Sequence, residues 1–318
     1  MIFEAEGDKP EQTDIPSRPF ARVAIRGIAE FATHFCASLT EHFDGDVDIG
    51  LIFVSLLRRA DLDGTGDGAM APISISALSR SVDRPFETVR RLCHRLFAME
   101  LAEQSDSGPF IPPHVVGQPM VLELRQAFHD NLVRMIGDLA GVGYPLPAAR
   151  GGASGVARDT IERAAMDMLL HTFEFGMPTQ PTRDWQRPFV YVSVMAANAR
   201  RYTFDPALSA QYPHANTPPP DYLRIPLGAS ALARAIGIPY STVRHNLATM
   251  TADGVLVRSG SGYLISMEWM QRPELATSAA LIAAQLDRAL RGLALAGFPM
   301  DAPQTAYWGG PPRLISFE

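Results

Sequence analysis

Residues 76–90 read SALSRSVDRPFETVR, and residues 230–244 read SALARAIGIPYSTVR. At a shift of 154 residues, from Ser76 to Ser230, the second segment lies over the first without a gap. The residues that recur identically are Ser76, Ala77, Leu78, Arg80, Pro85, Thr88, Val89 and Arg90. The same register continues downstream and places residues 107–108 over 261–262 and residues 143–146 over 297–300. Self-similarity at a fixed shift over this span indicates an internal duplication.

The two copies differ in the length of one loop. Residues 53–56 (FVSL) resemble residues 191–194 (YVSV) at a shorter shift, so the second copy carries a longer loop, residues 202–222, which is rich in proline. The boundary between the copies falls at residues 145–155 (PLPAARGGASG), whose prolines and glycines are typical of a linker. This stretch lacks the Gly-Lys-Ser/Thr ending of a phosphate-binding loop. The sequence therefore predicts two domains, residues 1–150 and residues 151–318.

Each copy has a largely helical pattern. Apolar residues at helical spacing predict helices over residues 20–42 and 49–59, then a short helix at 76–81 and a second one that begins at Pro85. The second helix is expected to bury one apolar stripe, made of Phe86, Val89, Cys93 and Leu96 in the first copy and of Tyr240, Val243, Leu247 and Met250 in the second. Two short strands joined by a hairpin follow, then a long helix over residues 121–139 and 275–295. The expected fold class is mainly α with small β wings.

This order of elements, two helices, a turn, a further helix and a two-stranded wing, is that of a winged helix-turn-helix. Residues 231–247 (ALARAIGIPYSTVRHNL), followed by DGVL at 253–256, resemble the helix-turn-helix of bacterial regulators of the Crp, GntR and MarR type. The first copy departs from that pattern, with Asp83 in place of the turn glycine and Glu100 in place of Gly254. A non-glycine residue in a left-handed turn costs about 1 kcal/mol. The resemblance implies two tandem winged helix-turn-helix units flanked by long helices.

The resemblance also implies that the second helix of each unit enters the DNA major groove with its N-terminal residues toward the bases. The expected DNA-binding residues are Arg84, Glu87, Thr88, Arg90, Arg91, His94 and Arg95 in the first copy, and Tyr240, Ser241, Thr242, Arg244, His245 and the wing residue Arg258 in the second. Arginine binds both phosphates and guanine edges. Alternatives to DNA contact stay open for both residue types. The arginines form an ordinary solvated helix face or pair with Glu87, Glu100 and Glu103. Thr88 and Thr242 bond to carbonyls of their own helices.

The net charge of −6 opposes this function, because nucleic-acid binders usually carry a basic surface that releases counterions from the phosphates. The relevant field is local, however, and residues 84–95 hold four arginines against the single Glu87. We therefore expect a transcriptional regulator that binds double-stranded DNA and reads a two-part, imperfectly symmetric site. The alternatives are a tandem winged-helix module for protein–protein contact and a replication-initiator-like protein.

Other classes of protein find little support. No apolar run reaches the length of a membrane span, and residues 1–19 lack the basic start and apolar centre of a signal peptide, so we expect a cytoplasmic protein. Cys36 and Cys93 are too few for a disulfide scaffold. Residues 61–68 resemble a calcium loop, but Pro72 stands where the bidentate glutamate belongs. His34 and Cys36 are two residues apart on a predicted helix, so their side chains point to different sides and do not form a metal site.

We accordingly expect no metal, no cofactor and no catalytic residues, since no nucleophile elbow, catalytic triad or paired-carboxylate motif is present. The helices that flank each unit, including residues 20–42 and 161–175, are the candidates for a homodimer interface or an effector sensor, and the sequence does not define the effector. Four residues there either line a pocket or belong to the core: Met166, Met168, Phe173 and Phe175.

Overall fold

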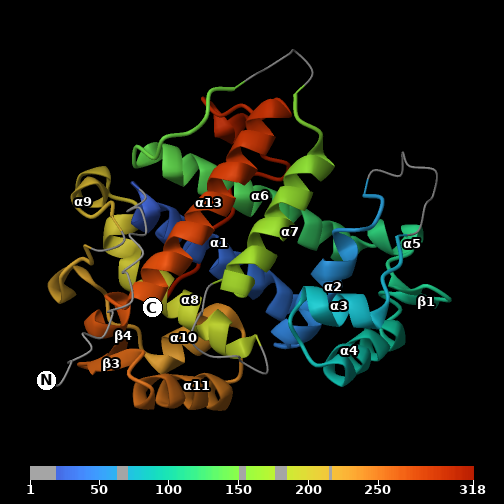
Figure 1. The fold of residues 1–318 in the computed structure, drawn as a ribbon, viewed down its shortest axis with the longest axis horizontal. Coiled ribbons are helices and arrows are strands. Elements are labelled where there is room, and N and C mark those ends of the chain that lie inside the picture. Colours follow the sequence, from blue (N-terminus) through green and yellow to red (C-terminus); the bar gives the residue numbers. More distant parts are fainter. Residues whose placement is uncertain (1–18, 63–70, 150–154, 176–184, 215–216) are drawn as a thin grey trace, which may run out of the picture.

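The computed structural model describes residues 19–62, 71–149, 155–175, 185–214 and 217–318. Within these ranges the chain is mainly helical, with thirteen α-helices and two small antiparallel sheets of two strands each (Figure 1). The expected mainly α class with small β elements is confirmed. The acidic N-terminus up to residue 18, most of the calcium-like loop, the centre of the linker and the side chain of Phe175 lie outside the described part.

The elements follow the duplicated pattern along the chain. The first copy comprises α1 (Ala21–His42), α2 (Val47–Leu57), α3 (Ile75–Ser81), α4 (Phe86–Ala98), β1 (Glu103–Ser105), β2 (Gly108–Phe110), α5 (Pro113–Val116) and α6 (Pro119–Gly141). The second comprises α7 (Arg158–Phe175), α8 (Gln186–Thr203), α9 (Pro206–Gln211), η1 (Asp221–Leu223), α10 (Ala229–Ile236), α11 (Tyr240–Ala252), β3 (Leu256–Ser259), β4 (Gly262–Ile265), α12 (Met267–Met270), α13 (Pro273–Leu295) and η2 (Pro303–Ala306). The helices α9 and η1 occupy the longer loop of the second copy.

The shift of 154 residues also holds for the boundaries of the elements. The pairs α4 and α11, α5 and α12, and α6 and α13 begin and end at equivalent positions. The backbone repeats too: Asp83 (φ 49°) is equivalent to Gly237 (φ 66°), and Glu100 (φ 57°) to Gly254 (φ 71°). The first copy thus holds two non-glycine residues in the left-handed positions where the second copy has glycine, as the sequence predicted.

The buried face of α4 differs from the expected stripe. Val89, Cys93 and Leu96 are buried as expected, but Phe86 is 43% exposed and Leu92 is buried in its place. The equivalent of Phe86 in α11, Tyr240, is 50% exposed. Both residues are the first of their helices, after an N-terminal Pro85 or Pro239, so they stand at the surface before the helix reaches the core. The predicted stripe was therefore wrong at its first position.

Each hairpin is held by the extended segment that precedes the first short helix of its copy. In the second copy the backbones of Leu227 and Tyr263 exchange two hydrogen bonds, with N–O distances of 3.1 and 3.0 Å. In the first copy Ile73 N–H donates to the Pro109 carbonyl at 3.2 Å, and proline has no N–H to return the bond. Each hairpin is therefore tied to its own copy by backbone pairing.

Gly108 is needed for this close approach. Its φ is +131°, and a Cβ there would lie 2.2 Å from the Ile73 carbonyl oxygen, whereas Gly137 on α6 has open space around it. We expect Gly108→Ala to lower the free energy of unfolding by about 2 kcal/mol or more, because backbone atoms must move. Gly137→Ala is expected to raise it by about 0.5–1 kcal/mol. Urea unfolding of both variants checks this, and a Gly108→Ala protein as stable as Gly137→Ala would contradict it.

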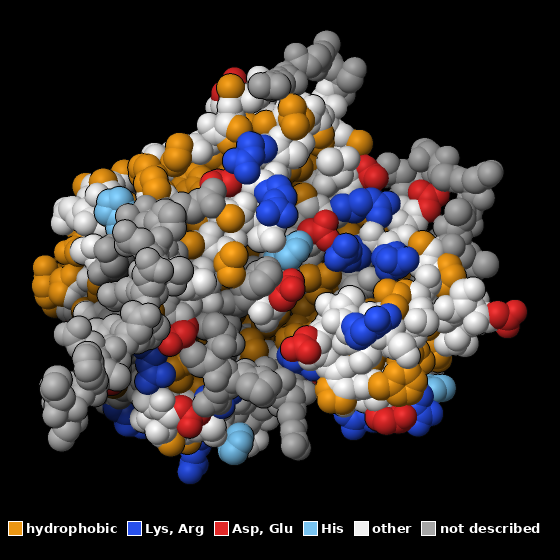
Figure 2. All heavy atoms as spheres, viewed as in Figure 1, with side chains coloured by type: hydrophobic (Ala, Val, Ile, Leu, Met, Phe, Trp, Pro, Cys, Tyr) orange, Lys and Arg blue, Asp and Glu red, His pale blue; other side chains and the backbone are white. Residues whose placement is uncertain are grey.

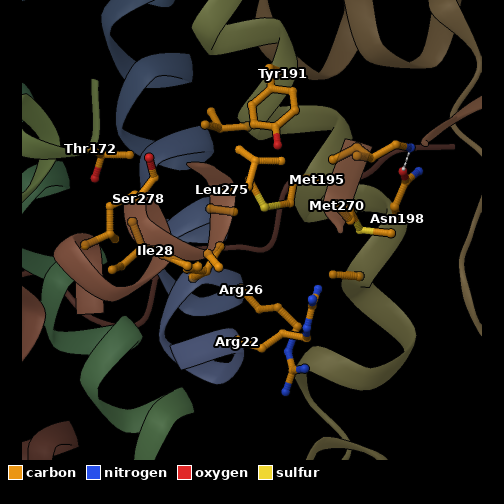
Figure 3. A pocket seen from close by; sticks show the side chains of 18 of the residues that line it. Arg22, Arg26, Ile28, Thr172, Tyr191, Met195, Asn198, Met270, Leu275 and Ser278 are labelled. Carbon is orange, nitrogen blue, oxygen red and sulfur yellow. Dashed lines mark hydrogen bonds between the residues drawn. The ribbon is translucent and has the colours of Figure 1, made fainter. Parts of the chain in front are cut away.

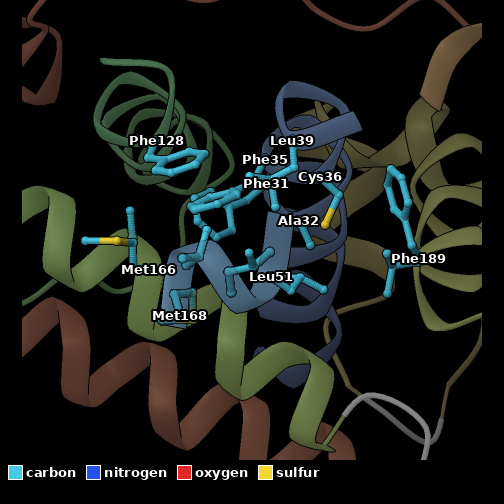
Figure 4. Packing of buried hydrophobic residues seen from close by; sticks show 14 of the residues in the cluster. Phe31, Ala32, Phe35, Cys36, Leu39, Leu51, Phe128, Met166, Met168 and Phe189 are labelled. Atoms are coloured by element: carbon cyan, nitrogen blue, oxygen red, sulfur yellow. The ribbon is translucent and has the colours of Figure 1, made fainter. Parts of the chain in front are cut away.

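The helix α1 lies at the centre of the molecule and packs against elements of both copies. Its partners are α6 of the first copy and α8 and α13 of the second (Figure 1). The rings of Phe35 on α1 and Phe128 on α6 stack with centroids 3.6 Å apart (Figure 4). One hydrophobic cluster of buried residues therefore extends through both copies.

The sequence left open whether four residues line a pocket or belong to the core. The three of them whose side chains are described belong to this cluster or pack against it. Met166 and Met168 are buried in it (Figure 4). Phe173 packs against it. Both cysteines are free and buried; burial raises the pKa of Cys36 well above its usual value and that of Cys93 to about 11. A thiol with a raised pKa is a poor nucleophile and packs as a small apolar group.

A buried ion pair joins the two copies. Arg125 on α6 donates from Nε to Oε2 of Glu162 on α7 at 2.6 Å, and from Nη2 to Oε1 at 3.2 Å. Arg125 also donates to the carbonyls of Leu62 and Val116, at 3.0 and 3.4 Å. Because both side chains are buried, this two-pronged contact fixes the position of α7 against α6.

Candidate nucleic-acid interface

The helix α4 has one buried face and one polar face. Val89, Leu92, Cys93 and Leu96 point into the core. The side chains on the opposite face are exposed, namely Glu87, Arg90, Arg91, His94 and Arg95. Five of the seven residues expected to contact DNA in the first copy therefore lie on one accessible surface.

Three of the four arginines in this segment have partners within the protein. Arg90 donates from Nε to Oε2 of Glu87 at 2.9 Å, one turn away on the same helix. Arg95 forms an ion pair with Asp46, which caps the N-terminus of α2. Arg84 is half-buried, with its guanidinium 4.4 Å from the centre of the Trp185 ring. Among the described residues Arg91 has no ion-pair or hydrogen-bond partner for its side chain.

The equivalent helix of the second copy, α11, buries Val243, Leu247 and Met250. On its other side Tyr240, Ser241, Arg244 and His245 are exposed. Within the described part of the chain the side chains of Arg244 and His245 make no hydrogen bond or ion pair. The second copy thus has fewer arginines on this face than the first, but its arginine is not engaged by a neighbouring carboxylate.

Thr88 and Thr242 occupy equivalent, half-buried positions. Neither hydroxyl bonds to a helix carbonyl in the described part of the structure; the Thr242 carbonyl instead accepts a bond from Asn246 Nδ2 at 3.0 Å. The hydroxyls therefore sit at the margin of the exposed face.

The two hairpins carry opposite charges. Arg258 on β3 donates from Nη1 to the Tyr263 hydroxyl at 3.0 Å, and its guanidinium lies 5.0 Å from the centre of that ring. The first hairpin instead has the exposed acids Glu103 and Asp106. The basic groups therefore come from the helix in the first copy, and from both helix and hairpin in the second.

The helices α4 and α11 both lie in the lower part of the view in Figure 1. There α11 lies at the bottom, left of the middle, and α4 lies at the lower right. Figure 2, in the same view, shows Lys and Arg side chains in both of these places, beside acidic and hydrophobic ones. The local surface is therefore mixed in charge.

Sequence reasoning missed the long-range partners of these residues. Asp46 and Trp185 are distant in sequence from Arg95 and Arg84, so no local pattern could reveal the contacts. The exposed aromatic residues at the helix starts, in contrast, are visible in the sequence. An aromatic residue directly follows the proline in both copies, Phe86 in the first and Tyr240 in the second.

Comparison with known proteins gives no relative: no family model, curated protein or solved structure matches the chain. In the described part of the chain, no helix combines the length and apolar character needed to cross a membrane. The same residues contain no group of three or more His, Cys, Asp or Glu placed to hold a metal ion.

Proposed function

We propose that the protein is a DNA-binding transcriptional regulator with two non-identical winged helix-turn-helix units. The observation that carries this is the pair Arg90 and Arg244, which lie at equivalent positions on the exposed faces of α4 and α11. Each helix follows a short helix and a left-handed turn, and precedes a hairpin tied to its own copy by backbone bonds. In a winged helix-turn-helix, this exposed face enters the major groove.

The intramolecular ion pair of Arg90 does not oppose DNA binding. Its side chain and that of Glu87 are 50% and 70% exposed, and such surface pairs contribute only about 0–1 kcal/mol. A phosphate competes with the carboxylate at little cost. Among the described residues, Arg91 and Arg244 have no carboxylate partner that DNA would have to displace. Arg84, on the Trp185 ring, and Arg95, paired with Asp46, have mainly a positioning role in this proposal.

The two units are expected to read different half-sites. Exposed positions on α4 hold Glu87, Arg91 and His94, where α11 holds Ser241, His245 and Ala248. Because base-edge contacts depend on the side chain, the two helices favour different base pairs. A single chain that carries both helices can bind a two-part site without a second copy. The proposal places the protein in the cytoplasm with double-stranded DNA as its partner, and assigns it no catalytic activity.

Selection from random duplexes tests this reading. We expect wild-type protein to enrich a two-part site with unlike halves, because the two exposed faces differ. Arg244→Ala should relax the sequence preference in one half only, and Arg91→Ala in the other. Enrichment of one short motif, or loss of preference in both halves with either variant, would contradict the assignment of one half-site to each unit.

One observation favours the second candidate, a module for protein–protein contact. Phe86 and Tyr240 are exposed aromatic residues at equivalent helix starts, and aromatic residues are enriched at protein interfaces. In that case Phe86→Ser and Tyr240→Ser would abolish partner capture, while the wild-type protein would show no affinity for DNA at low salt.

A further inference from the structure

A cavity with a volume of about 100 Å³ lies between α1, α8 and α13, and no residue of α4 or α11 lines it (Figure 3). Its walls are mostly apolar and include Ile28, Met195, Leu275 and Ile282. In Figure 3, Arg22 and Arg26 lie together at one end, whereas Met195, Met270 and Leu275 surround the middle. The cavity is therefore amphipathic, with an apolar body and a cationic end.

Arg26 is the unusual residue of this cavity, because its charge is buried without a counter-charge. It is 3% exposed and donates to the Tyr212 carbonyl at 3.0 Å and to Ser209 Oγ at 2.6 Å. Among the described residues no carboxylate pairs with it, and its Nε has no hydrogen-bond partner. Burying an ion without an opposite charge is costly. Burial lowers the pKa of Arg26 to about 10, with the nearby Arg22 adding to the effect.

Two further guanidinium groups lie at the same cavity as Arg26. Arg22 and Arg224 also line the cavity. Arg22 donates from Nε to the His214 carbonyl at 3.0 Å, and burial lowers its pKa. Arg224 pairs with Asp221 at 2.7 Å, but that carboxylate is largely exposed. A carboxylate in the cavity would supply the missing negative charge.

We propose that this cavity binds a small carboxylic acid whose apolar body lies among the α1, α8 and α13 side chains and whose carboxylate contacts Arg26. The volume limits the body to a short acyl chain, since a dry cavity that holds benzene measures roughly 150 Å³ and this one is smaller. Arg26 suits the head group because its Nε–H, which lacks a hydrogen-bond partner among the described residues, can donate a charge-assisted hydrogen bond to a carboxylate. This proposal does not rest on the proposed DNA-binding function.

The cavity is also connected to the second hairpin. Asn198, which lines it, accepts from Ile265 N–H at 2.9 Å and donates from Nδ2 to the Ile225 and Tyr263 carbonyls at 2.7 and 3.1 Å. Arg224 donates to the Ile265 carbonyl. Two cavity residues therefore hold β4, which pairs with the strand that carries Arg258. An acid bound here would contact the supports of this hairpin.

Isothermal titration calorimetry on the full chain, without DNA, tests the site. The probes are butyrate and valerate, and the neutral butyramide is the shape-matched control. We expect saturable 1:1 binding of at least one acid with Kd below about 1 mM. The amide should bind at least about tenfold more weakly, because it lacks the charge-assisted hydrogen bonds.

Three variants separate the cationic end from the apolar body. Arg26→Met removes the charge, and Ala279→Leu fills the cavity from α13 without altering an arginine; both are expected to weaken acid binding about tenfold or more. Arg291→Met, at an exposed position on α13, should bind like the wild type. Circular dichroism verifies folding, and Ala279→Leu and the amide comparison remain decisive if Arg26→Met does not fold.

Three results would overturn the proposal: no saturable binding of either acid up to about 10 mM, equal affinity for acid and amide, or unchanged affinity in Ala279→Leu. Because DNA is absent, any of these leaves the proposed regulator function unaffected.

Discussion

Replacing Glu162 with alanine is expected to lower the free energy of unfolding by about 3–5 kcal/mol. Glu162 is 0% exposed and accepts two hydrogen bonds from Arg125, at 2.6 and 3.2 Å. Among the described residues, its removal leaves a buried guanidinium with hydrogen bonds to the carbonyls of Leu62 and Val116 alone. The loss should therefore reflect an uncompensated charge as well as the lost contact. Urea denaturation followed by circular dichroism measures it.

Two matched variants show whether burial is the cause. Arg125→Met combined with Glu162→Leu removes both charges, and should be clearly more stable than Glu162→Ala alone. Glu87→Ala breaks the exposed pair with Arg90 and is expected to cost less than about 1 kcal/mol. Equal losses in Glu162→Ala and Glu87→Ala would show that the pair between α6 and α7 contributes no more than a surface contact.

Loss of both Arg90 and Arg244 is expected to weaken DNA binding by about 30-fold or more. Each arginine is the equivalent exposed cation of its helix, and a well-placed contact to a base edge is worth about 1–3 kcal/mol. Fluorescence anisotropy with labelled mixed genomic fragments at low salt measures the change. If the contacts reach phosphates instead, the slope of log K against log salt should become shallower by roughly one per arginine.

The matched control removes the same net charge elsewhere. Arg288 and Arg291 are exposed on α13, away from α4 and α11, so Arg288→Ala combined with Arg291→Ala should leave most of the affinity. Equal losses in the two double variants would indicate a general charge effect and refute the assignment of α4 and α11 to the groove.

The sequence predicted those features that depend on local pattern. The duplication placed α4 and α11, and α6 and α13, at matching positions, and the departures at Asp83 and Glu100 fall where the backbone is left-handed. These follow because turn chemistry and helix periodicity act over a few residues. The error at Phe86 arose at a helix end, where the apolar face has not yet met the core.

Contacts between distant segments could not be predicted. The positions of Arg84 on Trp185 and of Arg95 on Asp46 depend on how the copies pack, which a single sequence does not reveal. The same holds for α1, which packs against elements of both copies, and for the cavity with Arg26. Each needs residues that are brought together only by the complete fold.

Binding of the wild-type protein to double-stranded DNA across a salt series tests the central claim most directly. Contacts from two basic helix faces predict measurable affinity at about 50 mM salt that falls steeply as salt rises to about 200 mM, because each phosphate contact releases counterions. An acidic chain without such a surface would show no affinity for DNA at low salt and no dependence of affinity on salt. Absence of binding at low salt, or affinity that does not change with salt, would contradict the assignment of α4 and α11 to DNA.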